Sequence, residues 1–69
     1  MTNSVYKVIE LVGSSSESWE DAAKSAVEKA GLKLHELRIA EVSTLDMKME
    51  GGQVTAYRAK VKVSFKYED

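Results

Sequence analysis

The 69-residue chain contains no cysteine and only one histidine, His35. The absence of cysteine excludes disulfides and thiolate zinc sites, and one imidazole cannot assemble a histidine metal site within a single chain. A chain this short buries only about 60% of the surface that its unfolded form exposes. Small domains without disulfides or structural metals usually gain stability by self-association. The composition therefore favours a homo-oligomer.

Neither sign of charge dominates, because ten Lys and Arg residues stand against eleven Asp and Glu residues and give a formal net charge of −1. The chain therefore lacks the excess of positive charge that binding to nucleic-acid phosphates requires. No stretch approaches the roughly 18 apolar residues that span a bilayer, and no basic segment followed by a long apolar one opens the chain. We expect a cytoplasmic protein that binds neither nucleic acid nor membrane.

Motifs for catalysis and for metal binding are also missing. The single histidine, His35, is expected in a loop, and no Ser/His/Asp arrangement can be argued around it. Residues 13–16 (GSSS) lack the lysine and the glycine spacing of a phosphate-binding loop. The carboxylates that could serve a hard cation do not follow an EF-hand spacing and are interpreted as solvated; they are Glu17, Glu20, Asp21, Asp46 and Glu50. The sequence predicts no enzyme, no catalytic residue and no metal ligand.

Hydrophobic periodicity divides the chain into strand, helix, strand and strand, with no linker or repeat, so residues 1–69 form one domain. Residues 4–12 carry apolar side chains on both faces, which predicts a strand covered on both sides and ended by Gly13. Residues 14–16 offer serine hydroxyls that can cap a helix. Gly31 is expected to be the C-terminal cap of this helix, with Leu32 and Leu34 in a short turn. Its apolar stripe comprises Trp19, Ala22, Ala23, Ala26, Val27 and Ala30.

Residues 37–49 and 53–67 are predicted to form a hairpin, because Gly51 and Gly52 supply the positive φ angles of a two-residue turn. One face of the return strand is apolar, with Tyr57, Ala59, Val61, Val63, Phe65 and Tyr67, and the other is mostly basic, with Arg58, Lys60, Lys62, Ser64 and Lys66. We interpret the basic face as solvated or ion-paired. The fold class is α+β, with a three-stranded antiparallel sheet and the last strand in the middle.

The hairpin is longer than the helix available to cover it. A strand of about 14 residues extends roughly 46 Å, whereas a helix of about 15 residues extends roughly 22 Å. An exposed apolar stripe on a long sheet invites uncontrolled pairing. A closed symmetric oligomer would bury the uncovered part, and a curled sheet or a loose arm is the alternative.

Four segments together resemble the dodecin family over nearly the whole chain: residues 5–15 (VYKVIELVGSS), 18–30 (SWEDAAKSAVEKA), 38–42 (RIAEV) and 57–68 (YRAKVKVSFKYE). The resemblance implies a sheet partly wrapped around one helix, with twelve copies forming a hollow shell. It also implies a non-enzymatic protein that stores or buffers a flavin, riboflavin or FMN, at sites between subunits.

Two positions depart from the family's flavin-binding pattern. The pattern places a tryptophan before the segment Ala40-Glu41-Val42, where this chain has Ile39, and a glutamine after Tyr57, where it has Arg58. Isoleucine has no π-face for stacking, and arginine donates hydrogen bonds but accepts none. We expect Ile39 as an apolar wall, Arg58 as a polar contact suited to an anionic or planar ligand, and Glu41 and Tyr57 as neighbours.

These departures leave two interpretations open. One is a flavin-binding oligomer with reduced affinity for the unphosphorylated ring. The other is a structural or calcium-associated assembly without flavin, because some relatives that lack the tryptophan and the glutamine have been associated with calcium. The chain's only tryptophan, Trp19, lies on the helix stripe and is expected in the core, not in the ligand site.

Overall fold

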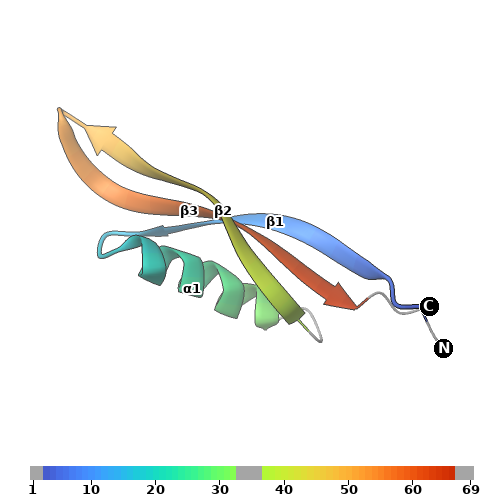
Figure 1. Ribbon diagram of the computed structural model, residues 1–69. Coiled ribbons are helices and arrows are strands. Elements are labelled where there is room, and N and C mark those ends of the chain that lie inside the picture. The colour runs from blue at the N-terminus through green and yellow to red at the C-terminus, as the bar shows by residue number, and fades with distance from the viewer. Residues whose placement is uncertain (1–2, 33–36, 67–69) are drawn as a thin grey trace.

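The computed structural model describes residues 3–32 and 37–66, and it has the predicted order of strand, helix, strand, strand: β1 (Tyr6–Ser15), α1 (Trp19–Gly31), β2 (Leu37–Glu50) and β3 (Gln53–Lys66). The sheet is antiparallel with the strand order β1-β3-β2. Figure 1 shows α1 against one face of the sheet and the tip of the β2–β3 hairpin extending past it. The predicted α+β class and the central position of β3 are confirmed.

The core lies where α1 crosses β3. Ala59, Val61 and Val63 of β3 are fully buried, and Ala22 of α1 is buried against them. The intervening β3 residues Arg58, Lys60 and Lys62 are exposed. The alternation read from the sequence therefore describes β3 correctly, and small alanines let the helix backbone approach the sheet.

Gly13 does not end β1, contrary to the prediction, because the strand continues to Ser15. A Cβ atom at Gly13 would overlap the carbonyl oxygen of Ala22 and lie 3.0 Å from the Cβ of Ala26. The glycine is thus required by the close approach of α1 to the sheet, and not by a chain reversal.

The helix begins later than the serine run suggested. Ser18 is the N-cap, and its hydroxyl accepts a hydrogen bond from the backbone N–H of Asp21 at 3.0 Å. Ser15 instead organises the turn before the helix, accepting from the backbone N–H of Glu17 at 2.9 Å and donating to the Asp21 carboxylate at 2.7 Å. A serine caps the helix as predicted, but it is Ser18 and not one of residues 14–16.

The helix end also differs from the prediction. Gly31 is the last helical residue, and the C-cap is Leu32, which has right-handed helical angles and donates its backbone N–H to the carbonyl of Lys29 at 3.2 Å. No left-handed residue is needed there, so the role expected of Gly31 is wrong. Leu34, His35 and Tyr67, for which a turn, a loop and a strand position were expected, lie outside the described residues.

The hairpin turn has the expected geometry, with φ of 58° at Gly51 and 78° at Gly52. The molecule is elongated, with extents of 56 × 20 × 15 Å. Covering of β1 on both faces is not found in the single chain, because α1 shelters one face while Tyr6, Val8 and Val12 on the other are each more than half exposed. Within residues 3–32 and 37–66, α1 lacks the length and apolar character needed to span a membrane.

We predict that Gly13→Ala lowers the free energy of unfolding by about 1–3 kcal/mol, because the added Cβ pushes α1 away from β1. The matched control is Gly31→Ala, whose Cβ would meet only Leu37 Cδ1 at an ordinary 3.8 Å. Denaturation with urea at one protein concentration compares the two variants. Equal midpoints for both would contradict the close-packing role of Gly13.

Candidate functional site

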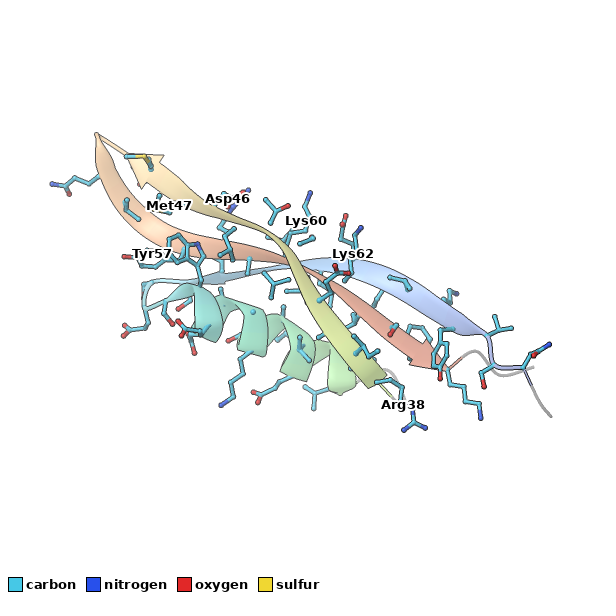
Figure 2. The ribbon with its side chains drawn as sticks, in the orientation of Figure 1. Arg38, Asp46, Met47, Tyr57, Lys60 and Lys62 are labelled. Atoms are coloured by element: carbon cyan, nitrogen blue, oxygen red, sulfur yellow. The ribbon has the colours of Figure 1, made fainter. Side chains whose placement is uncertain are left out.

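The four residues predicted to form the ligand site do not lie together in one chain. Tyr57 lies on the face of the sheet that α1 covers, where its ring meets that of Trp19 (Figure 2). Arg58 is the next residue along β3 and therefore lies on the opposite, outer face. Ile39 pairs with Ser64 and Glu41 pairs with Lys62, which places both near the other end of β3. Ile39 is 66% exposed.

The separation of Ile39 from Arg58 can be read from the strand register. Ile39 lies opposite Ser64, six residues along β3 from Arg58, and this corresponds to about 20 Å at 3.3 Å per residue. A pocket that used Ile39 as a wall and Arg58 as a polar contact would have to combine side chains from different chains.

Arg58 is held by a residue that the sequence reasoning did not connect with it. Its Nε donates to Asp46 Oδ1 at 2.7 Å and its Nη2 donates to Asp46 Oδ2 at 2.9 Å. This two-point geometry is the strongest form of a carboxylate–guanidinium contact. Each side chain is 47% exposed. Asp46 was interpreted as a surface carboxylate; it lies at the surface, and its partner there is Arg58.

A β-bulge places Asp46 opposite Arg58. Register continued from the turn, where Glu50 pairs with Gln53, would put Asp46 opposite Tyr57 on the helix side. The irregularity between Lys48 and Met49 shifts the strand pairing by one residue, so Asp46 pairs with Arg58 instead. The sequence alternation gives no sign of this irregularity, because Leu45, Met47 and Met49 continue one apolar face through it. The change of phase between Val42 and Leu45 coincides instead with the irregularity between Val42 and Thr44.

The ion pair fixes the charge state of both partners. The hydrogen bond from Arg58 holds the pKa of Asp46 below its usual value; the positive charges of Arg58 and Lys60 act in the same direction, and partial desolvation opposes them. The same hydrogen bond raises the pKa of Arg58. Both groups are therefore ionised at neutral pH, and their charges cancel locally.

Acidic residues on the neighbouring strands offset the rest of the basic face. Figure 2 shows Lys60 and Lys62 on the side of the sheet away from α1. Lys62 lies opposite Glu10 of β1 on one side and opposite Glu41 of β2 on the other. Opposite charges in such cross-strand positions attract. A solvated or ion-paired state was predicted for the lysines of this face. The register favours pairing for Lys62, and the ion pair of Arg58 with Asp46 was not predicted.

Trp19 joins the helix start to the hairpin. Its ring meets the ring of Tyr57 edge-on, with centroids 5.1 Å apart, and its indole N–H donates to the backbone carbonyl of Asp46 at 3.0 Å. The side chain is half-buried. Trp19 thus lies at the margin of the core, between α1 and the arm that carries Asp46.

An apolar groove separates α1 from β2. It consists of two adjoining hollows of about 420 and 360 Å³ that share Ala23 and Val42 as walls. Trp19 and Leu45 line the first, and Val27 and Ala40 line the second. The helix packs mainly on β1 and β3 and makes few contacts with β2. The groove between α1 and β2 is therefore open in the single chain.

The carboxylates considered for a cation do not converge. Among the described residues, no group of three or more His, Asp or Glu side chains is placed to hold a metal ion. Asp21 accepts from Ser15, Asp46 is held by Arg58, and Glu50 pairs with Lys48 at 3.5 Å. A calcium site in this protein would therefore need ligands from more than one chain or from outside the described ranges.

Comparisons with known proteins agree with this architecture. The calcium dodecin of Mycobacterium tuberculosis is 44% identical over 63 residues, which cover 91% of this chain and 89% of that protein. The solved structure of dodecin from Streptomyces coelicolor superposes with a TM-score of 0.91 at 33% identity, covering 100% of this chain and 99% of the other.

A second solved structure is that of the M. tuberculosis protein, described as a calcium-chelating calcium dodecin with a novel calcium-binding site. It has a TM-score of 0.83 and 43% identity over 93% of this chain and 91% of the other. The sequence profile of the Dodecin family matches residues 5–68. This chain therefore belongs to the dodecin family.

Proposed function

We propose that this chain forms a closed cytoplasmic homo-oligomer, a dodecamer, that binds and stores or buffers a small planar ligand at sites between subunits and catalyses no reaction. The ligand class that family membership favours is a flavin, riboflavin or FMN. The observation that carries the proposal is the division of the site residues over one elongated chain, whose apolar surface is left without cover.

Exposed apolar side chains support self-association. On β2, large apolar residues are about half exposed or more along most of the strand: Ile39, Val42, Leu45, Met47 and Met49. Val42 and Leu45 line the apolar groove beside α1, Met47 and Met49 follow on the hairpin arm, and Ile39 lies opposite Ser64 on the outer face. Monomeric proteins rarely leave contiguous apolar surface of this kind in water. Further copies of the chain are the proposed cover.

The ligand pocket is proposed at such a contact between copies. Ile39 offers apolar surface at one end of β3 and Arg58 offers hydrogen-bond donors about 20 Å away. A shared pocket therefore brings Ile39 and Glu41 of one subunit near Arg58 of another, while Tyr57 lies on the other face of that strand, against Trp19. A flat ring system suits such a slot because it can rest on an apolar wall while its polar edge meets the guanidinium.

A calcium-associated assembly is the second candidate. It is favoured by the 44% identical relative, whose name is calcium dodecin, and by the solved structure of that protein, described as having a calcium-binding site. Carboxylates at the start of α1, Glu17 and Glu20, are exposed. Brought together from several copies, they would supply the oxygen ligands that calcium prefers.

The assembly itself gives the first test. We predict that light scattering after gel filtration shows a particle with a mass about twelve times that of the 7.6 kDa chain. Leu45→Glu should reduce this mass, because a charge would enter the apolar groove. A wild-type protein that remains a stable monomer on dilution would contradict the proposal and remove the shared pocket with it.

Flavin binding gives the second test. We predict that the double variant Ile39→Trp, Arg58→Gln binds riboflavin about tenfold more tightly than the wild type, because stacking and a hydrogen-bond acceptor are restored. The measurement is quenching of riboflavin fluorescence as protein is added. The matched control is Ile39→Leu, which keeps an apolar wall without a π-face and should leave the affinity unchanged.

An unchanged riboflavin affinity in the double variant would show that the site is misplaced. Titration of the wild type with calcium in a calorimeter separates the two candidate functions. Calcium binding without any flavin quenching would favour the calcium-associated assembly, whereas quenching without calcium binding would favour the flavin-binding one.

A further inference from the structure

Asp46 occupies the position that decides what Arg58 can do. Both carboxylate oxygens are within hydrogen-bond distance of the guanidinium, at 2.7 and 2.9 Å. A guanidinium has five N–H donors, and Asp46 takes one from Nε and one from Nη2. The three remaining N–H groups, two on Nη1 and one on Nη2, form the end-on edge of the planar group. Arg58 therefore keeps donors for a ligand but has lost its forked Nε–Nη2 edge.

The pair is built into the hairpin. The backbone carbonyl of Asp46 accepts the indole N–H of Trp19 at 3.0 Å, which ties this point of β2 to the start of α1. The bulge between Lys48 and Met49 keeps Asp46 opposite Arg58. Both the backbone and the carboxylate of Asp46 are thus held in place, so the contact does not depend on a chance side-chain rotamer.

Cancelling the charge of Arg58 changes the ligand that the site favours. A phosphate group binds arginine best through two parallel hydrogen bonds and through charge. Asp46 already occupies the Nε–Nη2 fork. Its negative charge cancels that of Arg58 and repels a second anion from the remaining Nη1–Nη2 edge. A neutral ring with carbonyl acceptors needs only single donors, which the free side of the guanidinium still offers. Lys60, two residues along the same face of β3, is close enough for its positive charge also to lower the pKa of Asp46.

We propose that Asp46 is a specificity-determining residue, which withholds Arg58 from anionic ligands and so makes the site select an uncharged planar ligand over its phosphorylated form. This inference rests on the proposed flavin-class function and names its substrate class, riboflavin before FMN. Removing the carboxylate frees the fork of Arg58 beside Lys60 and turns the same place into a phosphate-binding one.

The test compares the dissociation constants of riboflavin and FMN for the wild type and for Asp46→Asn. We expect the variant to shift the ratio of the two constants in favour of FMN by about tenfold, because a freed guanidinium fork gains a charge-assisted contact with phosphate. The matched control is Glu50→Gln, which removes one negative charge from the same strand and an exposed ion pair with Lys48. Its ratio should stay at the wild-type value.

Two further variants test whether the effect comes from the Asp46 carboxylate itself. Asp46→Glu retains the carboxylate and should keep the preference for riboflavin. Asp46→Ser provides the same test as Asp46→Asn if the asparagine variant fails to assemble, which gel filtration reveals.

Each outcome decides a separate point. A ratio that is unchanged in Asp46→Asn, while flavins still bind, overturns the role of Asp46 and leaves the proposed function intact. An equal shift in Glu50→Gln also overturns it, because long-range charge alone would then account for the effect. FMN binding by Asp46→Asn without any flavin binding by the wild type supports the role of Asp46 and refutes the flavin function. No binding of either flavin to any variant overturns both.

Discussion

A helix of 13 residues has to shelter a sheet whose two longest strands have 14 residues each. A helix rises about 1.5 Å per residue and a strand about 3.3 Å, so α1 covers less than half of the hairpin. Close packing makes the most of that short contact: Gly13 lets the backbone of Ala22 approach β1, and alanines line the helix face. The surface beyond the helix, including much of β2 and the hairpin arm, stays exposed in the single chain.

Two bulges in the β2–β3 hairpin decide which β2 side chains lie on the helix side of the sheet and which lie on the outer side. Between the irregularities at Val42/Thr44 and Lys48/Met49, the register is shifted by one residue. The shift places Leu45 and Met47 opposite Ala59 and Tyr57 on the helix side, and it places Asp46 opposite Arg58 on the outer side. One local change in pairing thus keeps apolar groups together and creates the carboxylate–guanidinium pair.

That pair changes how the departures from the flavin-binding pattern are understood. An isolated arginine in place of a glutamine would be a free cation and would suit phosphate. Held by Asp46, Arg58 is instead part of a locally neutral, donor-bearing edge beside Lys60. The chemistry of the position follows from a contact across the hairpin and not from the identity of the substituted residue alone.

The sequence by itself determined the order of the elements, the central place of β3, the buried face with Ala59, Val61 and Val63, and the glycine turn, because periodicity and turn chemistry are local. It also identified the family through residues spread over the chain. Only the tertiary structure decided the role of Gly13, the cap at Ser18, the distance between Ile39 and Arg58, and the partner of Arg58. These depend on helix approach and strand register, which join residues far apart in the chain and which a single bulge can alter.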